Sequence, residues 1–501
     1  MSENNKQIKV GAIISYLTII FNLIVTLLYT PWMVSKIGKS NYALVTLSTS
    51  LISIFLMDFG ISSSVARFLA KYKAEGREDE IAKFLGVVYK LFIFISLVIC
   101  IVLFVIYFFI DKIYNGLSVE EIAQFKDLYI IVAGYSIVSF PFMPLDGILN
   151  SHEKFIQLKI CGLIQKSVSI ILMVLALILE FGVVAVVSAN AVSGIITIFI
   201  KLVIIRKAGM PSPDFKTKDK KIFKDIFSFS IWVTIISIAQ RCMFNLAPSI
   251  LGIVSNSDEI ACFSPANSLE SYFFVFASAI NGLFLPKISR LIANNEREQI
   301  MDLMIKVGKY QMIVLGLIFV GFCAIGKDFM ILWMGEDYVK SYYGAILIFI
   351  PDILIFSQQI ANTLMIVENK VNLQAIGYII MAVICLGASF ILSGLYGCVG
   401  ACMAIAIGYI ANFIYINIVY KKALHLDMKT FYKKCYSRTM PIHIVSMVLL
   451  LIIFHFMPKV SWMWLIIKGV IVVAVYLLLS LIFSITKTEK EFIKRKIFKR
   501  G

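Results

Sequence analysis

The run LFIFISLVICIVLFVIYFFI, Leu91–Ile110, decides the fold class of this 501-residue chain, because no charged side chain interrupts it. A helix of about 20 residues rises about 30 Å, which matches the hydrocarbon thickness of a bilayer. Similar runs recur along the chain, which is 60% hydrophobic and 15% charged, with a mean hydropathy of +0.90. A soluble protein of this length would carry more polar residues. The sequence therefore predicts an all-α integral membrane protein.

The apolar runs predict about 14 transmembrane helices. The first run is full length and has no small-residue cleavage site before Pro31, so we interpret it as a retained spanning helix. No loop is longer than roughly 25 residues, which leaves no room for a separate catalytic domain. The predicted spans, with ends placed to about 2–4 residues, are 11–33, 42–69, 85–110, 127–149, 160–180, 183–205, 227–252, 260–285, 309–332, 342–366, 375–393, 396–420, 439–457 and 462–485.

The distribution of basic residues predicts the orientation. Lys and Arg gather in residues 71–83, 206–224, 421–438 and 487–500, and the loops between these segments carry few. We count about 38 basic residues on one side and about 8 on the other, with Lys468 in the second group, which is the positive-inside pattern. Both termini are therefore predicted to be cytoplasmic. The net charge of +17 does not indicate nucleic-acid binding, because no basic segment lies on a soluble module.

Cysteine and histidine residues indicate neither a disulfide framework nor a metal site. The nine cysteines are scattered, mostly within apolar runs, and no CxxC pair occurs. The four histidines are equally dispersed. We expect no metal, no catalytic residue and no bound cofactor.

Short segments repeat at a nearly constant offset. Residues 181–185 resemble 396–401, 206–208 match 421–423, and 76–81 resemble 296–300. Lys154 likewise corresponds to Lys370. These matches predict two six-helix bundles in the same orientation, a parallel repeat that is typical of alternating-access transporters. The predicted domains are an N-terminal bundle at 1–210, a C-terminal bundle at 211–430, and two additional helices with a basic cytoplasmic tail at 431–501.

Polar residues at three- and four-residue steps mark the span 227–252. Thr234, Ser237, Arg241 and Asn245 share one face there. A charge at the bilayer centre costs at least ~2.5–3.5 kcal/mol, so each one is expected to face a cavity or a partner. We expect Arg241 to be the only basic residue deep in a span, either contacting an anion in a central aqueous cavity or forming a structural ion pair with Glu270.

Other polar residues within spans are candidate substrate or ion contacts. Serine and threonine in membrane helices often bond their own backbone, so amide and carboxylate side chains are the more informative ones. Pro351 precedes one such group and is a candidate site for a kink. The candidate cavity residues are Arg241, Asn245, Ser237, Gln358, Gln359, Asn362, Asn267 and Asn22. The candidates for binding a coupling H⁺ or Na⁺ are Glu270, Asp58 and Asp352.

The end of the second span carries a family resemblance. MDFGI at 57–61, ARF at 66–68 and KYKAEG at 71–76 resemble the D-F-G…R-F-x-A-x-Y-x-A-x-G signature of polysaccharide and O-antigen flippases. Residues 286–289 and 396–401 are similar to later segments of that family, which belongs to the multidrug/oligosaccharidyl-lipid/polysaccharide (MOP) exporter superfamily. The tripeptide at 58–60 also spells a kinase motif, but no glycine-rich loop, catalytic loop or P-loop accompanies it.

The resemblance implies a flippase with a fold like that of the multidrug and toxin extrusion (MATE) transporters of the same superfamily. Such a protein would translocate undecaprenyl-diphosphate-linked oligosaccharide repeat units across the bacterial cytoplasmic membrane for O-antigen or capsule-type polysaccharides. The family implies a cationic cavity for the diphosphate and sugar, a role that suits Arg241, while the lipid tail stays in the bilayer. Its implied partners are membrane lipid, a polysaccharide polymerase and glycosyltransferases, and it implies a transporter rather than an enzyme.

Three alternatives remain open at this point. A multidrug/cation antiporter of the same superfamily would favour an acidic cavity and typically twelve helices. A lipid II flippase would be a closer relative of the polysaccharide flippases than the antiporter is. A non-transporting membrane scaffold for polysaccharide assembly would have no need for polar stripes within its spans.

Overall fold

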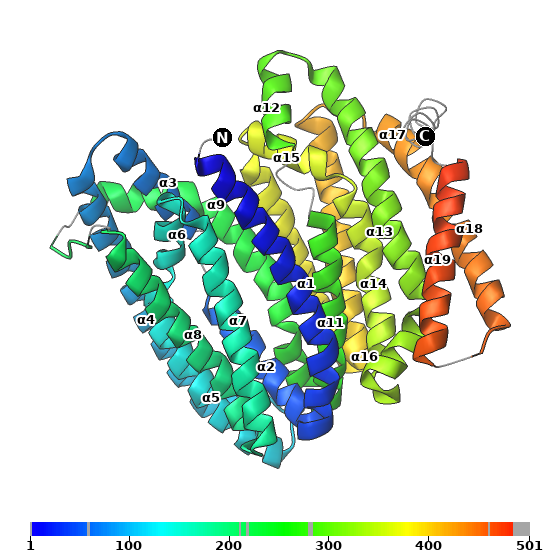
Figure 1. The fold of residues 1–501 in the computed structure, drawn as a ribbon, viewed down its shortest axis with the longest axis horizontal. Helices are drawn as coiled ribbons and strands as arrows, with labels where there is room; N and C mark the ends of the chain where they lie inside the picture. The colour runs from blue at the N-terminus through cyan, green and yellow to red at the C-terminus, as the bar shows by residue number, and fades with distance from the viewer. Residues whose placement is uncertain are drawn as a thin grey trace. The chain divides into compact units, whose positions relative to one another are not determined.

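Every regular element in the described part of the chain is a helix (Figure 1). The computed structural model describes residues 3–57, 61–209, 212–216, 220–278, 284–458 and 461–483. These residues pack as two compact units, Met1–Ala261 with Ser389–Gly397, and Cys262–Ala388 with Cys398–Gly501. We call them unit 1 and unit 2. The domain boundaries predicted at residues 210 and 430 are drawn from the sequence repeat, whereas these two units are defined by packing. The predicted boundaries therefore stay a prediction.

Unit 1 contains the helices from the N-terminus through α10. Their bounds are α1 Glu3–Ile37, α2 Lys39–Phe55, α3 Ile61–Ala74, α4 Glu78–Ile113, α5 Val119–Ser139, η1 Phe140–Phe142, α6 Pro144–Ser151, α7 Phe155–Ile178, α8 Gly182–Lys207, α9 Lys220–Asn245 and α10 Ala247–Val254.

Unit 2 contains most of the remaining helices, while α11 and α16 contribute residues to both units. Their bounds are α11 Ser257–Ser278, α12 Leu285–Ala293, α13 Arg297–Met334, η2 Glu336–Tyr338, α14 Val339–Phe356, α15 Gln359–Val367, α16 Val371–Lys422, α17 Met428–Phe431, η3 Tyr432–Tyr436, α18 Ser437–His455 and α19 Trp462–Phe483.

The helix surfaces fit a bilayer. Within the described residues, 10 helical stretches are long and apolar enough to cross a membrane. One face of α4 is exposed and wholly apolar, with side chains at three- and four-residue steps. Each of these side chains is about 60% exposed: Phe94, Leu97, Ile101, Phe104 and Phe108. Such a stripe would be unfavourable in water but matches lipid, so the chain is a multi-pass membrane protein.

Several predicted spans differ from the observed helices, and proline accounts for two of the breaks. The span 127–149 divides into α5, η1 and α6 around Pro141 and Pro144, and 227–252 divides into α9 and α10 beside Pro248. Pro351, a predicted kink, lies inside α14, and the break in 342–366 falls at Ser357 and Gln358 instead.

Three further predicted spans also differ, so the count of fourteen crossings stays a prediction. The span 42–69 corresponds to α2 and α3, which are separate helices. The spans 375–393 and 396–420 together form α16, which bends at Gly397. Gly397 has a φ of 56°, and a Cβ there would lie 2.3 Å from a Glu259 carboxylate oxygen, so only glycine fits the bend.

In unit 1, α5 packs against α2, α4 and α8. The phenol of Tyr129 on α5 donates to the Leu103 carbonyl of α4 at 3.0 Å, and Ser96 on α4 donates to the Ile137 carbonyl at 2.9 Å. Helix α7 packs against both α8 and α1. This arrangement places α1, α6, α7 and α8 around one region of unit 1.

In unit 2, α18 and α19 lie side by side and pack on α13 (Figure 1). A core of buried apolar residues joins the three helices, including Val320, Ile442 and Val472. Two polar contacts also connect them. Lys468 on α19, expected in an outer loop, is buried and forms an ion pair with Asp328 of α13 at 2.7 Å.

The second polar contact depends on a close helix approach. The Tyr476 hydroxyl of α19 and His443 Nδ1 of α18 are 2.9 Å apart, and both side chains are buried. Both lie against Gly316 of α13, where a Cβ would be 2.1 Å from His443 Cε1 and 2.4 Å from Tyr476 Oη. The missing side chain of Gly316 therefore provides the space for this pair.

We expect Gly316→Ala to destabilise unit 2 by about 1–3 kcal/mol, because α18 and α19 must move away from α13 to admit the methyl group. The control is Gly387→Ala, since a Cβ at Gly387 on α16 meets nothing within 4 Å. Thermal unfolding of the purified protein in detergent measures both. Equal unfolding midpoints for the two variants would contradict the packing described here.

Candidate functional site

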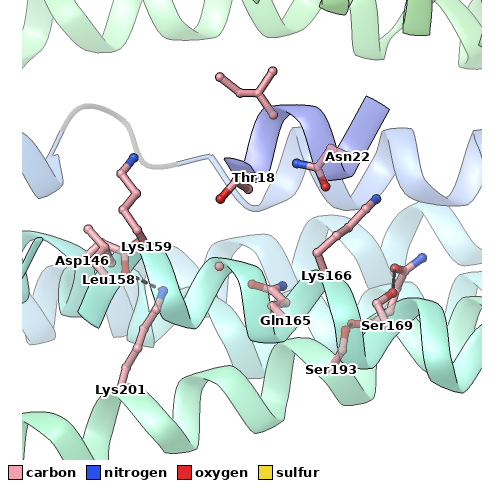
Figure 2. A pocket seen from close by; sticks show the side chains of 13 residues that line it. Thr18, Asn22, Asp146, Leu158, Lys159, Gln165, Lys166, Ser169, Ser193 and Lys201 are labelled. Atoms are coloured by element: carbon pink, nitrogen blue, oxygen red, sulfur yellow. Dashed lines mark hydrogen bonds and ion pairs between the residues drawn. The ribbon is translucent and has the colours of Figure 1, made fainter. Parts of the chain in front are cut away.

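A polar cavity of about 700 Å³ lies within unit 1, between α1, α6, α7 and α8. We call it the larger cavity (Figure 2). Its size falls in the range of small-molecule and cofactor sites. Its lining residues are Thr18, Ile19, Asn22, Asp146, Leu158, Lys159, Gly162, Gln165, Lys166, Ser169, Asn190, Ser193 and Lys201.

Helix periodicity brings the polar residues of α7 and α8 to this cavity. On α7, Lys159, Gly162, Lys166 and Ser169 follow one another at steps of three and four residues. On α8, Ser193 follows Asn190 by three residues, and Lys201 follows Ser193 by eight, about two helical turns. Each helix therefore presents one polar stripe, and the two stripes line one space.

The larger cavity is cationic. Its lining contains three lysines, Lys159, Lys166 and Lys201, and one acid, Asp146, for a formal charge of +2 (3 − 1). Lys201 Nζ forms an ion pair with Asp146 Oδ1 at 2.5 Å. Figure 2 shows Lys166 extending from α7 toward the side where Asn22 of α1 lies, and Lys201 directed toward Asp146. Two of the three ammonium groups thus have no carboxylate partner among the described residues.

Polar side chains complete the lining. Ser169 on α7 donates to the Asn190 side-chain carbonyl of α8 at 2.7 Å, which joins the two stripes at one end of the cavity. Lys166 lies near the middle of α7, one of the membrane-spanning candidates. An ammonium at that depth is tolerated where it faces water or an anion. The arrangement can therefore hold a hydrated anionic group inside a membrane helix bundle.

The structure places the predicted residues in several locations. Asn22 lines the larger cavity. Arg241 lies exposed on α9 and donates to the Ser53 carbonyl at 3.2 Å, and Ser237 and Asn245 on the same helix are half-buried. Arg241 and Glu270 belong to different units, so their predicted ion pair stays a prediction. Asp58 lies outside the described residues.

The predicted amides at the start of α15, Gln358, Gln359 and Asn362, lie in unit 2. The Gln358 amide donates to the Asn417 side-chain oxygen at 3.1 Å, and the Gln374 amide donates to Asn362 at 2.9 Å. Gln359 is also buried, while Asn267 on α11 is half-buried. The four predicted residues Gln358, Gln359, Asn362 and Asn267 do not line the larger cavity.

Two of the candidate acids, Glu270 and Asp352, lie near each other in unit 2. The ring of Phe273 stacks on that of Phe349 at 4.5 Å, and Glu270 and Asp352 are each one helical turn from these rings. The two carboxyl groups interact electrostatically. Asp352 is fully buried, and neither of its carboxylate oxygens has a hydrogen-bond partner among the described residues.

The sequence interpretation missed the lysines of the larger cavity. It expected Arg241 to be the only basic residue deep in a span, whereas Lys166 lies within α7 and Lys201 within α8. The signal was present in the three- and four-residue spacing from Lys159 to Ser169. Lysines inside apolar runs therefore indicate a polar cavity as directly as hydroxyl stripes do.

We expect Gln165→Cys, introduced after the nine native cysteines are replaced, to react with a charged, membrane-impermeant thiol reagent, because Gln165 lines the larger cavity. Phe199→Cys is the control, since Phe199 on α8 is 68% exposed on an apolar surface. Mass spectrometry measures the labelled fraction. Protection of Gln165→Cys to the same extent as Phe199→Cys would show that water does not reach the cavity.

Comparison with known proteins identifies similar sequences and folds. A family model described as "Polysaccharide biosynthesis protein" matches residues 8–292, more than half of the chain. No curated protein matches the sequence.

Solved structures resemble this chain over most of its length. A lipid II flippase, MurJ, in an inward closed conformation is 18% identical, covers 94% of this chain and 98% of its own, and has a TM-score of 0.73. An inward-facing multidrug resistance MATE family transporter is 12% identical, covers 82% and 99%, and has a TM-score of 0.63. A MOP superfamily transporter from Pyrococcus furiosus is 14% identical, covers 82% and 92%, and has a TM-score of 0.57. The fold is therefore that of MOP superfamily transporters.

Proposed function

We propose that this chain, which belongs to the polysaccharide biosynthesis protein family, is a flippase that translocates undecaprenyl-diphosphate-linked oligosaccharide repeat units. The observation that carries the proposal is the cationic cavity inside a membrane helix bundle. A diphosphate cannot cross hydrocarbon without losing its hydration, and lysines facing a wet cavity replace that hydration. The protein would act as a transporter rather than an enzyme.

The charge of the cavity separates this proposal from its alternatives. A multidrug/cation antiporter needs an acidic site for its substrate, whereas the larger cavity has a formal charge of +2 (3 lysines, 1 acid). A non-transporting scaffold has no use for two aligned polar stripes. A lipid II flippase would carry the same diphosphate chemistry, and we favour the polysaccharide repeat unit because of the family match.

Alternating access is the mechanism that we infer for this transport. It requires two rigid bodies with their own cores, and the described residues pack as two compact units. We infer that the protein lies in the bacterial cytoplasmic membrane with both termini in the cytoplasm, and that it delivers repeat units for O-antigen or capsule-type polymers. A polymerase and glycosyltransferases would be its partners, and Arg241 on α9 is a candidate further anion contact.

Backbone geometry supports the two pseudo-symmetric halves that alternating access would use. Gly76 and Asn295, 219 positions apart, have φ of 69° and 57°, and Glu153 and Asn369, 216 positions apart, have φ of 57° and 56°. At each of the four sites, the N–H of the following residue donates to a carbonyl oxygen that lies five positions before that following residue, as Arg77 donates to Tyr72. This left-handed helix termination therefore recurs at the offset of the sequence repeat.

We expect Lys166→Met to abolish surface polysaccharide export while membrane insertion continues, because the cavity loses one of its two ammonium groups that have no carboxylate partner. Lys166→Arg should retain part of the export, since it keeps the charge. The control is Lys287→Met on α12, where the lysine is exposed outside the cavity. Immunoblotting of surface polymer in a flippase-deficient host measures export, and normal export in Lys166→Met would remove the cavity from the mechanism.

Glu270 and Asp352 are the residues that we propose for ion coupling. Two adjacent carboxylates in a low-dielectric interior disfavour double ionisation, so such a pair holds a proton or a bound cation. Tyr409 of α16 interacts electrostatically with both carboxyl groups. Tyr378 and Cys385 of the same helix interact with Tyr409 in turn. No described lysine or arginine forms an ion pair with either carboxyl group.

We expect Asp352→Asn and Glu270→Gln to remove the response of transport to an imposed proton or Na⁺ gradient, because an amide neither ionises nor replaces a carboxylate as a cation ligand. Transport of a fluorescent lipid diphosphate in proteoliposomes measures this response. The control is Glu336→Gln in η2, where the carboxylate is exposed. An unchanged gradient dependence in both test variants would locate coupling elsewhere.

A further inference from the structure

A second cavity, of about 570 Å³, adjoins the larger cavity within unit 1. We call it the smaller cavity. The two cavities share four lining residues: Asp146, Leu158, Gln165 and Lys201. The ion pair between Lys201 and Asp146, at 2.5 Å, therefore lies at the junction of the two spaces.

The two cavities differ in charge. The larger cavity contains Lys159 and Lys166 in addition to the shared ion pair, whereas the smaller cavity has that pair as its only charged lining residues. The lining of the smaller cavity therefore has no formal net charge (1 − 1). An anionic group would be attracted to the larger cavity, and a neutral polar group fits the smaller one.

The smaller cavity combines aromatic and hydrogen-bonding side chains. Tyr135 and Phe142 supply rings, and Ser62, Asn150 and Thr197 supply hydroxyl and amide groups. A pyranose ring has apolar C–H faces and a rim of hydroxyls, so it is recognised by rings on its faces and by polar groups at its edge. The lining is therefore chemically suited to a neutral sugar.

Local breaks in the helices position these side chains. Phe142, Asp146 and Asn150 follow at four-residue steps from η1 into α6, where Pro141 and Pro144 separate α6 from α5. The Tyr135 ring lies directly on α8 at Gly194, because a Cβ there would be 1.9 Å from the Tyr135 hydroxyl oxygen. The aromatic wall thus depends on that glycine.

We propose that the smaller cavity is the subsite for the first sugar ring, a neutral pyranose attached to the diphosphate, and that the Lys201–Asp146 pair separates it from the diphosphate in the larger cavity. This inference rests on the proposed function. An ammonium has three N–H donors, so Lys201 keeps two for a phosphate oxygen or a sugar hydroxyl while it bonds Asp146. The pair thereby sets the order of the two subsites along the substrate.

The test compares two lipids that differ by one sugar. The full chain in nanodiscs is titrated with undecaprenyl diphosphate and with undecaprenyl diphosphate that carries N-acetylglucosamine. We expect the unmodified protein to bind the glycosylated lipid about tenfold more tightly. Phe142→Ala and Asn150→Leu should each lose most of this difference, while their affinity for the sugarless lipid stays within about twofold.

The control and a third variant separate the outcomes. Phe199→Ala on α8 removes an exposed ring outside both cavities, so it should keep the full difference between the lipids. Equal binding of the two lipids by the unmodified protein, or equal weakening of both lipids in Phe142→Ala and Asn150→Leu, would overturn the sugar subsite. If Lys166→Met instead leaves binding of the sugarless lipid unchanged, the proposed function fails first.

Discussion

The structure depends on one constraint: an ammonium group within a membrane helix must contact water or an anion. Lys166, near the middle of α7, meets this requirement only because its stripe faces the polar stripe of α8 and the polar residues of α1. Replacing the cavity with apolar packing would leave the charge in hydrocarbon. The lysines therefore determine both where water must enter unit 1 and which helices must surround it.

Breaks between helices of unit 1 place another charged side chain of the larger cavity. The prolines beside η1 end α5 and begin α6, which brings Asp146 to the Lys201 ammonium. Freed backbone groups are tolerated at membrane depth where they lie in protein or border a wet space. In unit 2, the Gln358 side-chain amide nitrogen donates to the side-chain oxygens of Asn417 and Tyr432. Both carboxylate oxygens of Asp352, by contrast, are buried with no hydrogen-bond partner among the described residues.

Composition and run length were enough to predict the all-helical membrane class, and the motif near Asp58 was enough to predict the family. The sequence could not show which helices break, because Pro351 continues inside α14 while the prolines around η1 end a helix. The pairing of Glu270 with Asp352 joins α11 to α14, and no local periodicity encodes such a contact. The lysine stripe of α7 was readable from spacing alone, but its meaning required the facing residues of α8.

The buried Lys468 has a consequence for biogenesis. Its partner Asp328 precedes it by 140 residues, so α13 leaves the ribosome long before α19. A lysine within a membrane helix carries an insertion cost, which a carboxylate on an already inserted helix offsets. Membrane integration of α19 is therefore coupled to the correct placement of α13, so an error in placing α13 would also impair insertion of α19.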